Sequence, residues 1–260
     1  MLCQEIINIL QEQSPESYAC SWDNVGLLVG SPQKEVKSIY IALDATDEAI
    51  EEAAEAGADL LLTHHPMIFK PLKRVNAEDF IGRRVIRLIQ NDISYYAMHT
   101  NFDVKGMAQL SGAKMGLREC QVLDVSFQQG DLQEGIGTVG LLPQEMTVAE
   151  CADLVKSAFG VGQVKVFGPL QKGVAKVAVC PGSGRSVIQE AICAGAQALV
   201  TGDIGHHEGI DAAAQGLAII DAGHYGVEKM FIPYMGAYLR ERAPGVQVLE
   251  QPKKEPFSYC

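Results

Sequence analysis

Short aliphatic runs alternate, in the first part of the chain, with stretches whose apolar residues recur every three or four positions. The aliphatic runs have the length of strands and lie at residues 39–43, 60–63 and 93–98. The amphipathic stretches predict helices at residues 2–13, 48–56 and 79–90. A strand–helix–strand order is typical of a parallel sheet covered by helices, so this part of the chain is predicted to be α/β.

The same alternation returns near the end of the chain. Strands are predicted at 174–179, 198–201 and 217–221, with a helix at 186–194. Gly57 and Gly195 end two of the predicted helices, and Thr63 and Thr201 end the strands that follow them. Both pairs are 138 residues apart (195 − 57 and 201 − 63). We interpret this offset as an internal repeat. A chance match of short Ala/Gly strings is the alternative, and the shared order of elements argues against it.

The residues between these two parts do not follow this strand–helix alternation. A glycine-rich strand is predicted at 135–142, a helix opened by a capping box at 147–159, and a strand at 163–167. The glycines do not predict a phosphate loop, because no Gly-Lys-Ser/Thr follows them and no helix comes directly after. The predicted fold is therefore α/β with two similar halves, each a mainly parallel sheet with covering helices. Residues 1–117 form the first half, 118–172 a short insert between the halves, and 173–260 the second half; the halves are expected to form one metal site.

Composition narrows the classes of partner. The chain has 260 residues, 47% of them hydrophobic, and a net charge of −11, which argues against a nucleic-acid backbone or an anionic membrane as the main partner. A locally basic pocket for a small phosphate compound is compatible with this charge.

No apolar run reaches the roughly 18 to 20 residues of a spanning helix, and the start lacks a basic signal region. Seven scattered cysteines without a CxxC pair predict reduced thiols in a cytoplasmic protein and disfavour cysteine zinc sites.

Every histidine lies in a polar cluster just after a predicted strand. The clearest case is Asp59-Leu-Leu-Leu-Thr63-His64-His65-Pro66, in which a buried strand ends in two adjacent imidazoles. The other four are His99, His206, His207 and His224. Ligands of open parallel sheets bind outside the carboxyl ends of the strands, and neutral imidazoles are good ligands for transition metals. The alternative is a pair of solvated or capping histidines.

Carboxylates complete the candidate metal ligands. Asp103 follows His99 by four residues, and Glu228 follows His224 by four, which puts both side chains of the second pair on one side of a helix. The five candidates are His64, His65, Asp103, His224 and Glu228. Five ligands are too many for one tetrahedral zinc and suit two ions bridged by a carboxylate. We therefore predict two divalent transition-metal ions per chain, with Zn, Fe, Mn, Co and Ni all compatible with nitrogen and oxygen ligands.

A second polar cluster occupies the position that corresponds to His64 in the repeat. It reads Thr201-Gly-Asp203-Ile-Gly-His206-His207-Glu208. His206 and His207 are candidate catalytic residues that would shuttle protons, contact substrate or support the ligands. The alternative is that they cap the helix predicted from residue 207 onward. The role of His99 stays open.

Five motifs, in this order and spacing, resemble the Nif-three-like (YbgI-type) family, whose members are often labelled type 2 GTP cyclohydrolase I homologues. They are SWDNVGLLVG, LLLTHHP, HTNFD, TGDIGHH and GHYGVE. The resemblance implies two similar α/β halves, a dinuclear metal site and a toroidal homohexamer built from dimers. Transferred motif by motif, the family's ligands fall on the same five residues. The short insert matches the compact form of the family. Some members carry an arginine after the Gly-x-Gly of the middle strand, where this chain has Thr138, which argues against a substrate contact from that strand.

The predicted function follows from the metal site rather than from a substrate motif. Two metal ions with open coordination positions suit hydrolysis of a phosphate ester, an amide or a purine ring carbon. Nothing selects GTP, because the chain has neither a guanine-reading NKxD motif nor a P-loop. We predict a dinuclear-metal-dependent hydrolase, with a GTP cyclohydrolase-like reaction as the named case and an unknown small-molecule substrate. The alternative is a non-catalytic metal-binding protein whose ring serves interaction or regulation; open coordination positions favour the enzyme.

Overall fold

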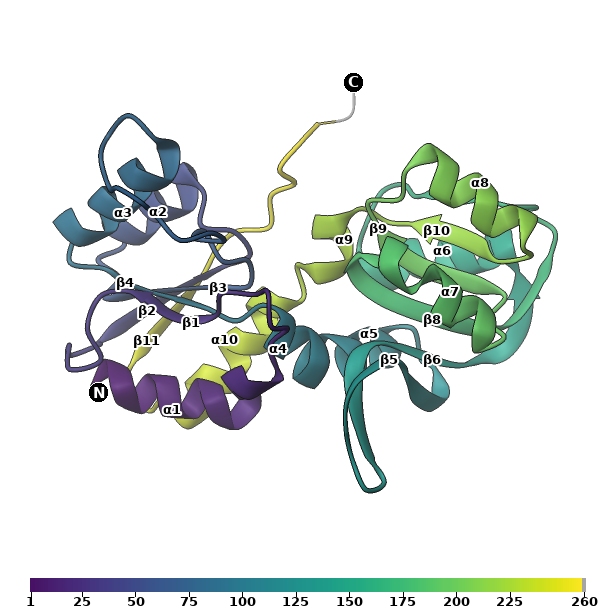
Figure 1. Ribbon diagram of the computed structural model, residues 1–260, viewed down its shortest axis with the longest axis horizontal. Helices are drawn as coiled ribbons and strands as arrows, with labels where there is room; N and C mark the ends of the chain where they lie inside the picture. Colours follow the sequence, from purple (N-terminus) through teal and green to yellow (C-terminus); the bar gives the residue numbers. More distant parts are fainter. Residues whose placement is uncertain (259–260) are drawn as a thin grey trace. The chain divides into compact units, whose positions relative to one another are not determined.

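The computed structural model describes residues 1–258, which divide into two compact units (Figure 1). The first unit comprises Met1–Phe102 and Phe231–Lys254, and the second comprises Asp103–Met230 with the residues from Glu255 onward. The chain therefore passes from one unit to the other directly after Phe102, Met230 and Lys254. Within residues 1–258, no helix combines the length and the apolar character needed to cross a membrane.

The first unit is a five-stranded sheet covered by helices on both faces. Its strands are, in sheet order, β1 (Gly26–Val29), β4 (Ser94–Ala97), β3 (Leu60–Thr63), β2 (Ser38–Ala42) and β11 (Gln247–Glu250). All neighbours are parallel except β1, which runs antiparallel to β4. The helices are α1 (Cys3–Gln13), η1 (Glu16–Tyr18), α2 (Asp47–Glu55), α3 (Phe80–Gln90), α4 (Thr100–Phe102) and α10 (Phe231–Arg242). Figure 1 shows α2 and α3 on one face of this sheet, with α1 and α10 on the other.

Local sequence explains where these elements begin. The side chain of Thr46 accepts a hydrogen bond from the Ala49 amide at the start of α2, and Asp79 does the same for Gly82 at the start of α3. Every residue of β2, β3 and β4 is buried, as expected for parallel strands covered on both faces. No charged residue or histidine lies within these three strands, and the candidate ligands His64 and His65 stand in the loop that follows β3.

The second unit is a mixed sheet of six strands. In sheet order they are β5 (Arg118–Gln129), β6 (Leu132–Thr147), β8 (Gly173–Ser183), β9 (Ala198–Gly202), β10 (Ala218–Asp221) and β7 (Lys165–Phe167). Only β8, β9 and β10 are parallel to one another. The helical segments are η2 (Asp103–Met107), α5 (Ala108–Lys114), α6 (Val148–Phe159), η3 (Gly184–Val187), α7 (Ile188–Cys193), α8 (His206–Ala214) and α9 (His224–Glu228).

The predicted internal repeat is present in the register of the strands. Ile39 of β2 pairs with Leu60 of β3, and the residues 138 positions later, Val177 of β8 and Ala198 of β9, form the corresponding pair. The third strand, β4 or β10, lies beside β3 or β9 in parallel, and an antiparallel edge strand, β1 or β7, follows it. The prediction of two similar α/β halves is thus confirmed, with the qualification that only the shared core of the second sheet is parallel.

The boundaries of the two compact units differ from those of the predicted segments. Residues 118–172 belong to the second sheet through β5, β6 and β7 rather than standing apart as an insert. Residues 231–254, expected in the second half, return to the first unit because β11 pairs in parallel with β2, with Val248 opposite Ile39. This pairing covers the edge of β2, whose unpaired backbone groups could otherwise pair with a strand of another chain.

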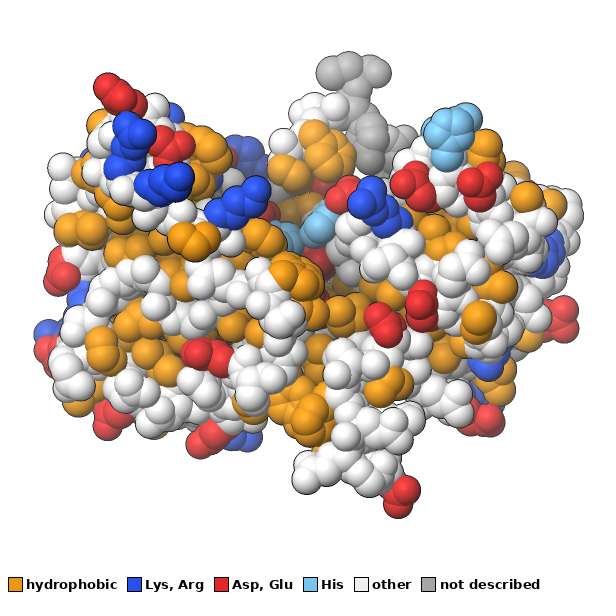
Figure 2. All heavy atoms as spheres, in the orientation of Figure 1, with side chains coloured by type: hydrophobic (Ala, Val, Ile, Leu, Met, Phe, Trp, Pro, Cys, Tyr) orange, Lys and Arg blue, Asp and Glu red, His pale blue; other side chains and the backbone are white. Residues whose placement is uncertain are grey.

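Basic side chains concentrate on one region of the first unit. Figure 2 shows Lys and Arg gathered over α2, α3 and the loop that precedes α3. Two of these cations join the helices: Arg84 pairs with Asp47 at 2.7 Å, and Arg87 pairs with Glu51 at 2.6 Å. Arg83 also lies on α3, and Lys70, Lys73 and Arg74 lie on the loop between β3 and α3.

Candidate metal centre

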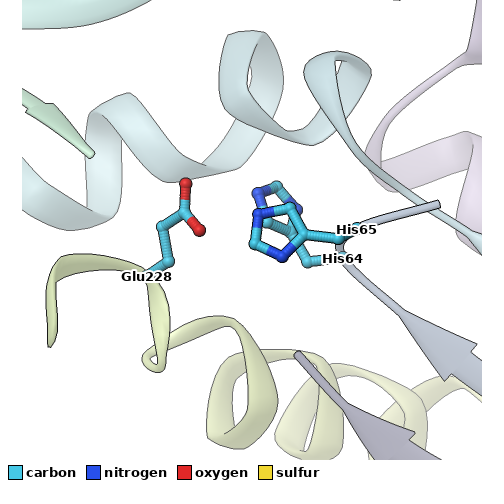
Figure 3. A group of neighbouring side chains, drawn as sticks. All are labelled: His64, His65 and Glu228. Carbon is cyan, nitrogen blue, oxygen red and sulfur yellow. The ribbon is translucent and has the colours of Figure 1, made fainter. Parts of the chain in front are cut away.

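The end of β3 presents two histidines whose rings are held by hydrogen bonds. Thr63 Oγ1 donates to the carbonyl of His65 at 2.8 Å and fixes the turn after the strand. His64 is fully buried, with Nδ1 2.7 Å from the carbonyl oxygen of Met98. His65 is partly exposed, with Nδ1 2.8 Å from Oδ1 of Asp44. The two ring centroids are 4.8 Å apart (Figure 3).

These partners decide which ring nitrogen of each histidine can bind a metal. A backbone carbonyl and an ionised carboxylate only accept hydrogen bonds, so Nδ1 of both His64 and His65 carries the proton. In the neutral ring the lone pair then lies on Nε2. A hydrogen bond from one ring nitrogen to an oxygen is the usual support for a histidine that binds metal through the other nitrogen. Both residues therefore fit the predicted ligand role.

A third histidine of the first unit adjoins this pair. The ring of His99 lies 5.4 Å from that of His64 and 5.5 Å from that of His65, measured between centroids. Its Nδ1 is 2.9 Å from Oδ1 of Asp23, whose side chain is completely buried. The other oxygen of Asp23 accepts from the amide and the hydroxyl of Thr100, at 3.0 and 2.6 Å. His99 is thus fixed in orientation beside the two candidate ligands.

In the second unit, α9 brings His224 and Glu228 together. They are one turn apart, with His224 Nε2 3.1 Å from Glu228 Oε2. Two ligands with bonds of about 2.1 Å to one ion would stand roughly 3.0 to 3.4 Å apart, so this spacing fits a shared ion. Nδ1 of His224 lies 2.7 Å from Oδ2 of Asp203, which again leaves the lone pair on Nε2. The predicted i, i+4 pair is therefore confirmed as neighbours on one helix.

A glycine makes room for the Glu228 carboxylate. β8 runs to Ser183, and its pairing with β9 is irregular between Val179 and Ser183. Gly182 has a φ of +74°, a conformation that glycine adopts without strain. A Cβ at this position would lie 2.4 Å from Oε1 of Glu228 and 3.6 Å from Nε2 of His224. The backbone of β8 therefore closes one side of the candidate site.

The remaining candidate, Asp103, is the first residue of the second unit. It opens the π-helical turn Asp103–Met107, an irregularity that is frequent at functional sites. Burial raises the pKa of the Cys180 thiol far above its usual range, and the charges of Asp103 and Glu228 raise it further. Both carboxylates therefore lie near Cys180 at the end of β8. The thiol stays protonated and is not in the form that binds metal.

The sequence did not predict that three aspartates support the histidines. Asp23, Asp44 and Asp203 accept from Nδ1 of His99, His65 and His224 respectively. Asp44 and Asp203 stand just after the strands β2 and β9, in the same kind of polar strand end that identified the histidines. The position after a strand was therefore a usable signal, although it could not assign each aspartate to its partner.

The predicted catalytic pair lies elsewhere on the second unit. His206 and His207 form the first turn of α8, both are exposed, and their ring centroids are 5.2 Å apart. Their predicted part in proton transfer or substrate contact stays a prediction.

The donor set fits a divalent transition metal. His64, His65 and Glu228 stand as candidate metal ligands (Figure 3), and His224 and Asp103 offer donors of the same two kinds. Imidazole nitrogen with carboxylate oxygen suits Zn, Fe, Mn, Co or Ni, and it does not choose among them.

Comparison with known protein families decides where the chain belongs. The model of the family Duf34/NIF3 (NGG1p interacting factor 3) matches residues 1–256. The chain belongs to the Duf34/NIF3 family. The family resemblance predicted from the five motifs is thereby confirmed.

Relatives within the Duf34/NIF3 family match over the whole length. A protein of Clostridium perfringens named "GTP cyclohydrolase 1 type 2 homolog" is 36% identical over 270 residues, covering 100% of both chains. A Bacillus cereus protein related to NIF3 has a solved structure with a TM-score of 0.93 and 26% identity, covering 100% of this chain and 99% of that one. A hypothetical protein of Staphylococcus aureus has a TM-score of 0.89 and 28% identity, with the same coverage.

Proposed function

We propose that this Duf34/NIF3 protein is a hydrolase that depends on two divalent transition-metal ions. The ligands would be His64 and His65 of the first unit with Asp103, His224 and Glu228 of the second. The observation that carries the proposal is that all three histidines donate Nδ1–H to an oxygen, so that each directs the lone pair of Nε2 outward as a ligand would. Ions bound there would act as Lewis acids and supply a nucleophilic water near neutral pH.

Chain connectivity supports a site shared by the two units. The ring of His64 packs on Phe102 and Phe231, with centroids 6.1 and 5.3 Å away, and all three belong to the first unit. Phe102 is followed directly by Asp103, and Phe231 comes three residues after Glu228. Asp103 is thus adjacent in sequence to one of the two aromatic residues that pack on His64, and Glu228 is three residues from the other.

The protein's own residues would hold and orient the reacting groups. The carboxylates of Asp44 and Asp203 make the imidazoles of His65 and His224 better ligands, because each accepts the ring proton opposite the metal-binding nitrogen. The second oxygen of Glu228 would allow it to bridge two ions. Chemistry of this kind suits a phosphate ester, an amide or a purine ring carbon, and the name carried by the relatives supports a GTP cyclohydrolase-like reaction as one case.

Metal analysis combined with one variant and its control tests the proposal. Protein purified without chelator and then supplied with metal should contain two ions per chain. Glu228→Gln should lose at least one ion and all hydrolysis, whereas Glu190→Gln, on α7 of the same unit, should keep both ions. One ion or fewer per chain in the unmodified protein would contradict the proposal. Two ions without turnover in a broad hydrolase screen, run with each metal in turn, would favour the non-catalytic alternative.

The assembly is a separate proposal. The family resemblance implies a homohexameric ring, and light scattering should then give a mass near six chains. A mass of one chain at micromolar protein concentration would contradict the proposed ring.

A further inference from the structure

Two large aromatic side chains of the first unit lie together and remain open to solvent. Trp22 is 59% exposed and Phe69 is 47% exposed. Their rings are stacked, with centroids 5.8 Å apart and planes 26° from parallel. Trp22 follows η1 in the loop before β1, and Phe69 stands on the loop after β3, so two distant parts of the sequence contribute one aromatic surface. Exposed apolar surfaces of this kind are characteristic of binding sites.

The ring of His99 contacts both this aromatic surface and the candidate metal ligands His64 and His65. The His99 ring centroid lies 6.0 Å from that of Trp22 and 5.9 Å from that of Phe69, both in edge-to-face contact. The same ring also contacts His64 and His65. His99 therefore connects the aromatic surface to the predicted metal site within the first unit.

The orientation of His99 makes it a hydrogen-bonding group for a ligand on that surface. The buried Asp23 carboxylate accepts from Nδ1, and Thr100 holds the carboxylate in place with its amide and hydroxyl. Thr100 Oγ1 is in turn fixed by the amide of Cys20 at 2.8 Å. The ring cannot turn without breaking this chain of bonds, and its Nε2 is left to accept from a ligand N–H or O–H.

Cations follow the aromatic surface directly in the sequence. Lys70, Lys73 and Arg74 come one to five residues after Phe69, and all three are exposed. No ion pair within residues 1–258 joins any of them to a carboxylate, in contrast to the paired arginines of α3. Lys73 and Arg74 also line a shallow hollow of about 430 Å³ before α3, together with Asn76, Glu78 and Asp79. In a chain with a net charge of −11, a cluster of unpaired cations favours an anionic ligand.

We propose that Trp22, Phe69 and the loop that follows Phe69 bind a nucleotide. The planar base stacks on Trp22 and Phe69, with an edge toward His99, and the phosphate pairs with Lys70, Lys73 or Arg74. Stacking on aromatic side chains recognises any base, whereas lysine and arginine recognise the phosphate. The inference rests on the proposed function in one respect, because it takes the nucleotide to be the substrate of the neighbouring metal site.

Intrinsic fluorescence measures this binding directly, because Trp22 is the only tryptophan of the chain. The purified full-length protein is titrated with AMP, GMP, CMP and UMP, with the corresponding nucleosides, and with ribose 5-phosphate. N-acetyltryptophanamide corrects for absorption by the ligands. At least one nucleotide should quench the emission in a saturable way, and its nucleoside and ribose 5-phosphate should each bind at least about tenfold more weakly. Absence of saturable quenching by all four nucleotides would overturn the proposal.

Matched variants separate the two halves of the nucleotide site. Phe69→Leu should weaken nucleotide binding by about 5- to 150-fold, the range for loss of one stacked base. Phe80→Leu is the control, since Phe80 is 51% exposed on α3 of the same unit. The double variant of Lys73→Ala with Arg74→Ala should weaken the nucleotide and leave the nucleoside unchanged, with Lys37→Ala as its control. Equal effects of a variant and its control would overturn the assignment.

Other occupants and the proposed function are distinguished in the same experiment. If Trp22 emission changes with protein concentration but not with added nucleotide, the surface binds a second copy of the chain. A single-stranded DNA decamer that binds more than 100-fold tighter than any mononucleotide would assign it to a nucleic-acid strand. Either result overturns the proposal. Binding is measured without turnover, before and after chelation. Nucleotide binding without hydrolysis therefore contradicts only the proposed function, and hydrolysis without quenching of Trp22 contradicts only this inference.

Discussion

Nδ1 of His224 lies 2.7 Å from Oδ2 of Asp203, and Asp203 makes this contact from a left-handed backbone conformation with a φ of 56°. Aspartate and asparagine are among the few residues other than glycine that adopt this conformation readily. The preceding Gly202 lies against the start of α9, where a Cβ would meet the His224 amide nitrogen at 2.5 Å. The end of β9 is thus shaped to bring a carboxylate to the ring of His224.

Replacing this carboxylate should weaken metal binding without disturbing the backbone. Asp203→Asn keeps a side chain that tolerates the left-handed conformation, but a neutral amide is a poorer acceptor for Nδ1–H. We expect metal affinity to fall by about 10- to 100-fold, the usual cost of removing a group that supports a ligand. Competition with a chromogenic chelator measures the affinity.

A second aspartate provides the control for this variant. Asp92 also has a positive φ, 51°, and its exposed carboxylate pairs with Lys34 of the first unit. Asp92→Asn should leave metal affinity unchanged. A loss of the same size in both variants would show that the effect does not come from the bond to His224.

The buried carboxylate of Asp23 should make stability depend on pH in a defined window. Burial raises the pKa of Asp23, but hydrogen bonds from His99 and Thr100 outweigh it and lower the pKa to about 2. Because the pKa is lower in the folded state than in the unfolded one, ionised Asp23 stabilises the fold above pH ~4. That stabilisation, about 2 kcal/mol, is lost as the pH falls from ~4 to ~2.

Urea denaturation of the unmodified protein and of Asp23→Asn measures this contribution. The difference in unfolding free energy should be constant above pH ~5 and should shrink below pH ~4, since Asp23→Asn lacks the titrating group. A difference that stays the same down to pH 3 would contradict the role assigned to the carboxylate.

Local patterns sufficed for the elements that flank the candidate site. β3 occupies residues 60–63 as predicted, because its three leucines and Thr63 stand between a glycine turn and two histidines. The i, i+4 spacing likewise placed His224 and Glu228 on one helix. These features depend on residues that are neighbours in the sequence, so the sequence alone was enough to identify them.

Features that depend on distant contacts could not be predicted. β11 is short, and its pairing with β2 joins Val248 to Ile39 across most of the chain. β5 carries an apolar alternation at Leu123, Val125 and Phe127, but the strand is largely exposed and this local pattern does not say which strand it pairs with, so its place in the second sheet came only from the structure. The partners of Asp23 and Asp44 are likewise set by tertiary packing. A shared site for all five ligands stays a prediction.

The exposed histidines of α8 should be dispensable for metal binding. His206→Ala and His207→Ala should each retain both ions, because neither residue belongs to the proposed ligand set. If the pair transfers protons, turnover should fall by about 100- to 10,000-fold while metal content is unchanged. Elemental analysis beside the kinetics separates the two effects. Metal loss in His207→Ala, with both ions retained in Glu228→Gln, would mean that the ligand assignment is wrong.

Two glycines with the same backbone conformation test whether β8 shapes the candidate site. Gly182 and Gly195 both have a φ of +74°, but a Cβ at Gly195 meets nothing within 4 Å, whereas one at Gly182 collides with the end of the Glu228 side chain. Alanine at either position should cost about 1 to 2 kcal/mol of stability from backbone strain. The Glu228 carboxylate can move aside at little further cost to the fold, but it then leaves the position in which it would bind metal.

Gly182→Ala and Gly195→Ala should therefore have similar unfolding free energies and different metal affinities. We expect a loss of at least about tenfold in affinity for Gly182→Ala alone, comparable to the loss of other support for a ligand. Urea denaturation of the metal-free proteins gives the strain, and chelator competition gives the affinity. Because both variants carry the same strain, only the contact with Glu228 can separate them. Equal metal affinities in the two variants would therefore exclude Gly182 from the metal site and count against Glu228 as a ligand.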